Sequence, residues 1–238
     1  MKLISNSKTE IFCDGANYKD MILLNKKKYI KGFTTNPSLM RSAGVNNYTN
    51  FAKRILKIIK KKSVSFEIFS DDLEEMYLQA CKISKWGKNV FVKVPITNTK
   101  GISCAPVISA LLKKKIKVNI TAVFTYQQIN DLHSIIKKND TCIISIFAGR
   151  IADTGVSPVK IIKKAVNLFS KKRKVKILWA STREPYNLIE AQNINCHIIT
   201  IPISMLTKLN SIGKDLKEFS RETVKMFYDD AKKSLYKI

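Results

Sequence analysis

Histidine, acidic residues and long apolar runs are all scarce in this chain of 238 residues. The two histidines, His133 and His197, lie far apart, which argues against a metal site built from histidine. The five cysteines are widely spaced and form no CxxC pair, so we expect reduced thiols and not disulfides or zinc ligands. No apolar run reaches the roughly 18 residues of a membrane-spanning helix, and the N-terminus shows no apolar signal-peptide segment. We therefore expect a cytoplasmic protein without membrane partners and without a metal site built from histidine or cysteine.

The scarcity of acids gives the chain a strong positive charge, because 43 lysines and arginines face only 18 aspartates and glutamates, for a formal net charge of +25. Such a charge could attract nucleic acid. However, the basic runs, such as 60–62 and 171–174, are spread along the chain, and no aromatic residues are interleaved to stack on bases. We interpret the charge as lysine-rich solvated surface whose field helps to attract an anionic metabolite. A basic nucleic-acid-binding protein is the non-enzyme alternative.

Short β-branched runs alternate with amphipathic stretches about eight times along the chain. Strands are predicted at 10–14, 29–35, 63–69, 89–96, 117–124, 141–148, 175–181 and 196–202. Helical spacing of apolar residues is clearest at 48–62, 71–86, 104–115, 126–138 and 158–172, and a final helix is expected at about 214–236. No Gly/Ser/Pro-rich linker interrupts the pattern. The sequence therefore predicts an α/β fold, a single (β/α)8 TIM barrel over residues 1–238 with a C-terminal helix. A doubly wound open sheet is less favoured, because no GxGxxG turn follows the first strand.

One lysine, Lys93, interrupts the apolar stretch "NVFVKVPITN" at residues 89–98. Because successive side chains of a strand face opposite ways, Val92 and Val94 are predicted to face the helices, and Phe91 and Lys93 the barrel axis. Lys93 also lies toward the carboxyl end of its strand, where barrel active sites are built. An ammonium is costly to bury, and an amine without its proton is a nucleophile that can form a Schiff base with a ketone. The alternative is a lysine that extends to the barrel mouth as an ion-pair partner.

Polar side chains fall at the ends of several other predicted strands. In chain order they are Asp14, Asn36, Glu67, Asn119, Thr121, Ser145, Arg150, Ser181 and Arg183. By alternation, Trp179 is expected on the same face as Ser181 and Arg183. Each of these could be a hydrogen-bonded core residue, but the carboxyl ends of all the strands meet at one end of a barrel. Their joint placement around an inward lysine predicts a catalytic site.

The strings that carry these residues resemble the transaldolase family from the first strand to the eighth. The matching stretches are "CDGAN" (13–17), "GFTTNPSLM" (32–40), "SFEIF" (65–69), "FVKVPIT" (91–97), "NITAVFT" (119–125), "SIFAGRIADTG" (145–155), "WASTRE" (179–184) and "HIITIPISML" (197–206). A lysine on the fourth strand is itself a mark of this family. "CDGAN" and the residues after Arg150 depart from the usual wording of the family, which leaves the preferred acceptor open.

The resemblance implies a mechanism that needs no metal or organic cofactor, and a role for each residue of the site. Lys93 matches the Schiff-base lysine, which attacks the C2 carbonyl of a ketose phosphate. Asp14 matches the acid/base that takes the C4 hydroxyl proton as the C3–C4 bond breaks. Glu67 and Thr121 match the pair that moves protons through a water molecule. The remaining matches bind substrate: Asn36, Asn119 and Ser145 at the dihydroxyacetone part, and Arg150, Ser181 and Arg183 at the phosphate, for which guanidinium groups are well suited.

Two positions bear on which branch of the family the chain is similar to. The chain is short, as in the fructose-6-phosphate aldolase-like branch. Glu67, however, is an acid as in transaldolases, and Phe147 stands where the aldolase branch has a tyrosine that can assist protonation of the enamine. We therefore expect a transaldolase of the pentose phosphate pathway, which transfers dihydroxyacetone from sedoheptulose 7-phosphate or fructose 6-phosphate to an aldose phosphate. The alternatives are an aldolase that releases dihydroxyacetone and a relative acting on another anionic ketose.

The resemblance also implies a homo-oligomer, because family members form dimers or larger rings. The last helix could pack on its own barrel or on that of a neighbour, and the sequence does not distinguish the two.

Overall fold

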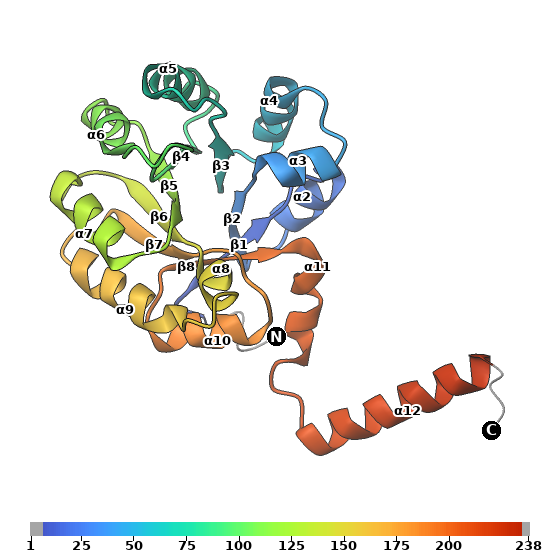
Figure 1. Cartoon of the computed structure of the whole chain (residues 1–238). Helices are drawn as coiled ribbons and strands as arrows, with labels where there is room; N and C mark the ends of the chain where they lie inside the picture. The colour runs from blue at the N-terminus through green and yellow to red at the C-terminus, as the bar shows by residue number, and fades with distance from the viewer. Residues whose placement is uncertain (1–6, 235–238) are drawn as a thin grey trace.

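Eight parallel strands close into a barrel in which each strand pairs with the next in the sequence and β1 pairs with β8 (Figure 1). The computed structural model describes residues 7–234. The strands are β1 (Glu10–Asp14), β2 (Ile30–Thr34), β3 (Ser63–Glu67), β4 (Val90–Pro95), β5 (Val118–Val123), β6 (Cys142–Ile146), β7 (Val175–Trp179) and β8 (Ile198–Pro202). The predicted (β/α)8 TIM barrel is confirmed.

Helices follow the strands, and most of them cover the outside of the barrel (Figure 1). They are α2 (Tyr18–Asn25), α3 (Pro37–Ser42), α4 (Tyr48–Ile58), α5 (Leu73–Ser84), α6 (Ala105–Lys113), α7 (Tyr126–Ile135), α8 (Ala148–Ala152), α9 (Pro158–Phe169), α10 (Tyr186–Asn193), α11 (Ile203–Leu206) and α12 (Leu216–Ser234), with a 3-10 turn, η1 (Lys208–Ser211). Side-chain oxygens of Asn47, Asp72 and Thr125 cap the first turns of α4, α5 and α7.

Two hydrophobic clusters build the core. The larger one fills the layer between strands and helices and includes Val92 and Val94 of β4, as alternation predicts. The smaller one lies inside the barrel and consists of Phe12, Phe91, Ile143, Leu178, Ala180 and Ile198. The inner cluster closes the barrel, so that the polar inward residues lie toward its carboxyl end.

The first and eighth strands end where they were predicted to end, but the other predicted strands end later than those in the structure, because the pattern cannot tell where a strand turns into a loop. The sixth strand, predicted to reach residue 148, ends at Ile146, since Phe147 is the N-cap of α8, which starts at Ala148. The final helix, expected at 214–236, spans Leu216–Ser234, and residues 235 and 236 lie outside the described part.

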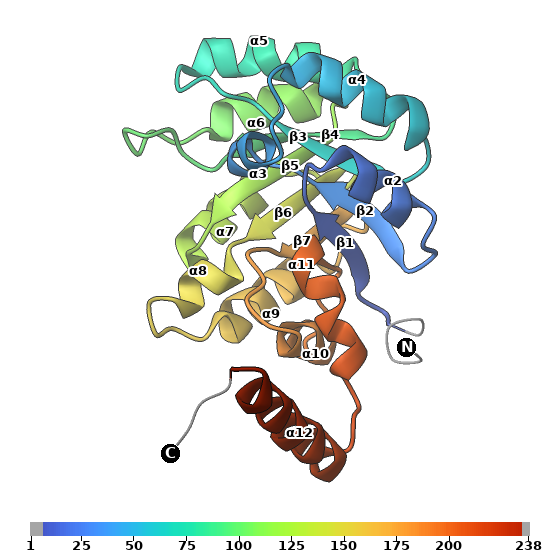
Figure 2. The same ribbon diagram turned by 90° about the vertical axis from the view of Figure 1, so that its right-hand side faces the viewer.

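Helix α12 differs from the others because it does not cover the barrel. It projects away from the other elements in both views (Figures 1 and 2), and none of its described residues is buried. Among residues 7–234, no helix is long and apolar enough to cross a membrane.

Candidate active site

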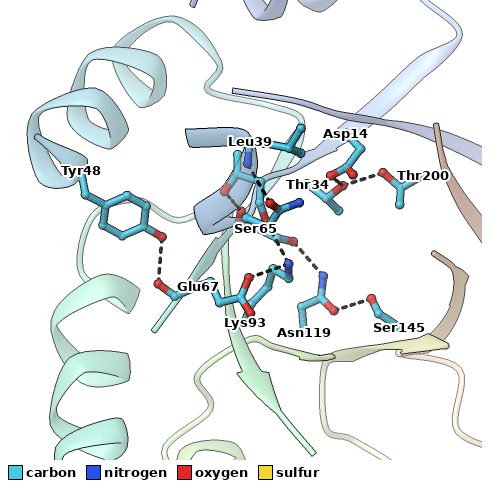
Figure 3. Close-up of polar contacts among 12 residues, drawn as sticks. Asp14, Thr34, Leu39, Tyr48, Ser65, Glu67, Lys93, Asn119, Ser145 and Thr200 are labelled. Atoms are coloured by element: carbon cyan, nitrogen blue, oxygen red, sulfur yellow. Dashed lines mark hydrogen bonds and ion pairs between the residues drawn. The ribbon is translucent and has the colours of Figure 1, made fainter. Parts of the chain in front are cut away.

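Lys93 is buried inside the barrel, with an exposed fraction of only 7%. Its Nζ donates hydrogen bonds of 2.9 Å to Glu67 Oε2 and of 2.9 Å to the carbonyl oxygen of Thr35 (Figure 3). The strand register explains this arrangement, because Glu67 of β3 and Asn119 of β5 lie directly beside Lys93 of β4. The amine is therefore held between a carboxylate and a carbonyl, and the prediction that it faces the barrel axis is confirmed.

A cavity of about 420 Å³ opens over this lysine. It is lined by Asp14, Thr34, Asn36, Pro37, Ser38, Leu39, Glu67, Lys93, Thr121, Ser145, Phe147, Arg150, Leu178, Ala180, Ser181 and Thr200. Nine of the eleven residues predicted for the site are among them. Asn119 and Arg183 are not.

Asp14 ends β1 on the opposite wall from β4 and belongs to a chain of hydroxyl groups. Thr34 Oγ1 donates a hydrogen bond of 2.7 Å to Asp14 Oδ1, and Thr34 Oγ1 and Thr200 Oγ1 lie 2.5 Å apart (Figure 3). Burial raises the pKa of the Asp14 carboxyl above its ordinary value, while the Thr34 hydrogen bond and the charge of Lys93 act against that rise. A carboxyl in these surroundings is suited to both taking and returning a proton.

Asn119 lies beneath the cavity and not on its surface. It is fully buried, its Nδ2 donates a 3.0 Å hydrogen bond to Ser65 Oγ, and its Oδ1 accepts one of 2.7 Å from Ser145 Oγ (Figure 3). Ser145 itself lines the cavity. In this structure Asn119 therefore holds Ser145 in place. Both polar side-chain atoms of Asn119 already have hydrogen-bond partners.

Thr121 is placed by an irregularity in β5. The pairing of β5 with β6 shifts between Ile120 and Val123, and Ala122 between them has a φ of 58°, in the left-handed region. The alternation of side chains therefore breaks here, and Val123 packs in the outer core in place of Ala122, which regular alternation from Ile120 would put there. Thr121 Oγ1 is buried at the cavity wall without a hydrogen-bond partner among residues 7–234. Such a hydroxyl is available to a water molecule or a ligand.

The end of β7 also departs from simple alternation. Trp179 packs in the outer core, whereas Ser181 lines the cavity, so the prediction that they share a face is wrong. The reason is the backbone, because Ser181 has a φ of 61° and turns the chain. Gly149 of α8 lies against this turn, where an added Cβ would be only 1.8 Å from the Ser181 carbonyl oxygen. This close contact places Arg150, the next residue of α8, at the cavity.

Arg183 points elsewhere in this structure. Its guanidinium forms an ion pair with Asp153, and the residue lines a neighbouring cavity of about 380 Å³. Both side chains are about half exposed. On the described residues, Arg150 is thus the arginine that faces the cavity above Lys93.

Asn36 has a structural role at the rim of the cavity. Its Oδ1 accepts a 2.9 Å hydrogen bond from the Leu39 backbone and so caps α3, which begins at Pro37. This bond fixes the side chain where the resemblance expects it to contact substrate.

Several site residues were missed by the sequence analysis. Thr34 of β2 and Thr200 of β8 are inward residues, and Thr35 directly follows β2. Tyr48 donates a 2.9 Å hydrogen bond to the Glu67 carbonyl. The sequence signal for these threonines was their inward position at the ends of β2 and β8. The signal is weak, because threonine is also an ordinary strand residue.

Four of the five cysteines are buried, and Cys81 is partly exposed. All five are free, and Cys13, which precedes Asp14, is buried, which raises the pKa of its thiol to about 12. It is therefore no candidate nucleophile. Among residues 7–234, no group of three or more His, Cys, Asp or Glu side chains converges as a metal site requires.

The fold and the site together define a (β/α)8 barrel protein with an inward lysine, flanked by carboxylates, at the carboxyl end of the strands. The family model described as "Transaldolase/Fructose-6-phosphate aldolase" matches residues 11–238. The chain belongs to this family.

Individual relatives agree. A "Probable transaldolase" from Thermoanaerobacter sp. (strain X514) is 31% identical over 201 residues, 84% of this chain and 88% of the relative. A "Probable transaldolase" from Nitrosopumilus maritimus (strain SCM1) is 33% identical over 202 residues, which are 84% of this chain and 86% of the relative. A solved structure, "Crystal structure of a putative lyase/mutase from Burkholderia cenocepacia J2315", has a TM-score of 0.57 at 11% identity and covers 100% of this chain and 90% of its own. It supports the fold alone. The family and the relatives indicate an enzyme of the transaldolase/aldolase class.

Proposed function

We propose that this protein is a transaldolase that transfers a dihydroxyacetone unit from sedoheptulose 7-phosphate or fructose 6-phosphate to an aldose phosphate through a Schiff base on Lys93. The observation that carries the proposal is the buried Lys93 amine, 2.9 Å from Glu67 Oε2, at the base of a cavity whose far wall holds Asp14. We propose that it acts in the cytoplasm, which fits five free thiols.

The proposed reaction begins with proton movement around Lys93. The amine must lose a proton before it can attack the C2 carbonyl, and Glu67 is the carboxylate within hydrogen-bond distance. Glu67 and the unpaired hydroxyl of Thr121 then serve carbinolamine formation and loss of water. Asp14 takes the proton of the C4 hydroxyl as the C3–C4 bond breaks, so that the electron pair of the bond remains in an enamine on Lys93. The aldose phosphate formed from C4 onward then leaves the site. The enamine carbon attacks the carbonyl of a second aldose phosphate, Asp14 returns its proton to the new C4 hydroxyl, and water hydrolyses the Schiff base to release the new ketose phosphate from Lys93.

Arg150 and Ser181 are the proposed phosphate ligands, because both line the cavity and their side chains can donate hydrogen bonds to phosphate oxygens. In this proposal Arg183 joins them only if its ion pair with Asp153 opens. Since both partners are half exposed, that pair costs no more than about 1 kcal/mol to break.

Borohydride trapping tests the proposal. Reduction in the presence of fructose 6-phosphate should attach a three-carbon adduct to Lys93, which peptide mass spectrometry locates. The Lys93→Ala variant should show no adduct, whereas Lys100→Ala, which removes an exposed lysine, should be labelled like the wild type. An adduct on another lysine, or none with any ketose phosphate, would overturn the proposal.

A second candidate function is an aldolase that releases free dihydroxyacetone. Phe147 bears on the choice, because it lines the cavity as an apolar ring packed against the inner core and offers no hydroxyl to protonate the enamine. We propose that this favours transfer. The Phe147→Tyr variant should release more dihydroxyacetone relative to transfer to erythrose 4-phosphate. A wild-type enzyme that turns over fructose 6-phosphate equally well without an acceptor would favour the aldolase.

A further inference from the structure

A second cavity, of about 420 Å³, opens at the amino end of the barrel, opposite the cavity above Lys93. Its walls come from residues at or just before the starts of strands, since Glu10 is the first residue of β1, Ser63 of β3 and Cys142 of β6. We call it the amino-end cavity. Cavities that hold small molecules have volumes of about 300–1,000 Å³, so this one is large enough for a ligand.

The lining of the amino-end cavity is strongly basic. The basic residues are Lys117, Arg173, Lys174 and Lys176, and the acidic one is Glu10. Four positive charges against one negative charge leave this lining with a formal charge of +3. The cavity above Lys93 differs, because its two basic residues are matched by two acidic ones. The excess of positive charge is therefore particular to the amino-end cavity and not a general property of the hollows of this basic chain.

Three of these four cations have no carboxylate beside them. Glu10 Oε1 lies 2.5 Å from Lys176 Nζ. Within residues 7–234, no carboxylate forms an ion pair with Lys117, Arg173 or Lys174. A hollow lined by charges of one sign focuses the electric field and raises the local concentration of counterions. An anion placed among these side chains would therefore be stabilised.

Lys117 is held at the wall of the cavity by its surroundings. Its Nζ donates a 2.8 Å hydrogen bond to the carbonyl oxygen of Lys88 and lies 5.8 Å from the centre of the Phe91 ring. Neither contact neutralises the ammonium charge, so it remains available to an anion. The side chain is also partly buried, which reduces the freedom that a ligand would have to restrict.

A neighbouring histidine is also subject to the positive charge at this end of the barrel. His197 directly precedes β8, and its pKa is lowered from the ordinary value, chiefly by burial and further by the charge of Lys176. The charge of Glu10 acts against this shift but has the smaller effect. The carboxylate therefore does not cancel the charge of Lys176, even though the two groups form an ion pair.

An apolar floor separates the amino-end cavity from the active site. Four residues of the inner cluster line this cavity, namely Phe12, Phe91, Ile143 and Ile198. The other two, Leu178 and Ala180, line the cavity above Lys93. One layer of packed side chains thus lies between the two cavities, and a ligand in the amino-end cavity does not reach Lys93.

The chemistry of the lining favours phosphate groups. The guanidinium of Arg173 can bind two phosphate oxygens at once, and the lysine ammonium groups bind phosphate as point charges. A single phosphate monoester carries a charge of about −1.5 to −2 at pH 7, which is less than the charge of the lining. A chain of linked phosphates matches it better. Any organic part attached to that chain can rest on the apolar floor.

We propose that the amino-end cavity binds a polyphosphate group, either as a free inorganic chain or as the phosphate end of a nucleotide. This inference does not rest on the reaction proposed above, because the two cavities are separate.

Isothermal titration calorimetry of the full chain tests this proposal, with ATP and with tripolyphosphate, at about 0.15 M salt and without divalent cations. At least one of the two anions should bind with a micromolar dissociation constant. Adenosine, which lacks phosphate, should not bind. Equal affinity for both anions would identify the phosphate chain alone as the ligand, whereas tighter binding of ATP would identify a nucleotide. Either result supports the proposal.

The variant Lys117→Gln/Lys174→Gln should raise the dissociation constant at least about tenfold, because it removes two charged donors from the cavity. The matched control Lys53→Gln/Lys57→Gln removes the same charge from two exposed positions of α4 and should stay within about twofold of the wild type. If the control weakens binding as much as the cavity variant, the net charge of the chain attracts the anion and the proposal is wrong.

A second cavity variant covers the case in which loss of the hydrogen bond from Lys117 to Lys88 destabilises the barrel. Arg173→Gln/Lys174→Gln changes two exposed side chains before β7 and should weaken binding to a similar extent, with the circular dichroism of the wild type. A wild type that binds neither anion would overturn the proposal. So would binding that survives in both cavity variants, because the anion would then lie elsewhere, for example beside Arg150 in the active site.

Discussion

At the scale of single residues, the carboxyl group of Asp14 is subject to two opposing influences. Burial raises its pKa, because the charged form loses hydration. The hydroxyl of Thr34, 2.7 Å from Asp14 Oδ1, lowers the pKa because it donates a hydrogen bond to the charged form. The pKa of the proposed proton carrier therefore depends on a neighbouring hydroxyl group.

Replacing Thr34 by valine should move the low-pH limb of kcat to higher pH. Without the hydroxyl, the pKa of Asp14 rises further, so a higher pH is needed before Asp14 is ionised and able to accept a proton. At a pH below the limb, the variant should lose severalfold more activity than it loses on the plateau. The pH profile of kcat for fructose 6-phosphate measures this.

Thr34→Ser provides the control, because it keeps a hydroxyl beside Asp14 and should leave the limb near its wild-type position. A Thr34→Val limb that stays in place or moves to lower pH would mean that another group titrates there.

A site residue could be predicted from the sequence where a charged side chain stands at a strand position that is expected to face the inside of the barrel. Lys93 and Glu67 stand out because a charged side chain is rare among buried strand residues. Thr200 does not stand out, since its partner Thr34 is 166 residues away and becomes a neighbour only when β8 pairs with β1. The side-chain direction of Ser181 could not be predicted either, because alternation assumes extended backbone and Ser181 has a positive φ.

At the scale of elements, the contact between α8 and the end of β7 fixes the side of the cavity where phosphate is proposed to bind. Gly149 Cα lies so close to the Ser181 carbonyl that no side chain fits between them. Ser181 and Arg150 are therefore held together through the backbone and not through their own side chains.

The Gly149→Ala variant should separate these two elements. Its Cβ would be 1.8 Å from the Ser181 carbonyl oxygen, so the backbone of α8 or of the β7 end must shift. We expect a loss of about 1–3 kcal/mol in the free energy of unfolding, together with a higher KM for phosphorylated substrates. Denaturant unfolding and steady-state kinetics measure the two effects.

Ala152→Ser, an exposed change in the same helix, should alter neither quantity by much. If Gly149→Ala has wild-type stability and KM, the close contact does not position the phosphate side of the site.

The regular elements were predictable because their apolar residues repeat over several turns or strand positions. Helix α8 was not, since five residues are too few to show a helical period. The start of the short α3 was indicated by Pro37, although its six residues are also too few to show a helical period.

At the scale of the whole molecule, closure of the barrel brings the ends of eight strands together, and this is why inward residues far apart in the sequence could be assigned to one site. The final helix was predictable from its amphipathic pattern, but its projection away from the barrel was not. The same pattern fits a helix packed on its own chain, and the choice depends on the turn at Gly213.

The net charge of +25 leads to a prediction about ionic strength. Raising the salt concentration from about 0.01 M to about 1 M shortens the screening distance from about 30 Å to about 3 Å. The field of the whole molecule then no longer reaches an approaching phosphate, and only short-range contacts such as the one proposed for Arg150 remain. We expect KM for a phosphorylated acceptor to rise about three- to tenfold over this range.

The matched control is an acceptor of similar size without a phosphate, such as erythrose in place of erythrose 4-phosphate, whose KM should change little. Steady-state kinetics at several salt concentrations distinguish the two. If both KM values rise in parallel, salt acts on the protein and not on the attraction between charges. If neither rises, the excess lysines on the barrel surface make no contribution to substrate capture, and the binding of the phosphate depends on the cavity alone.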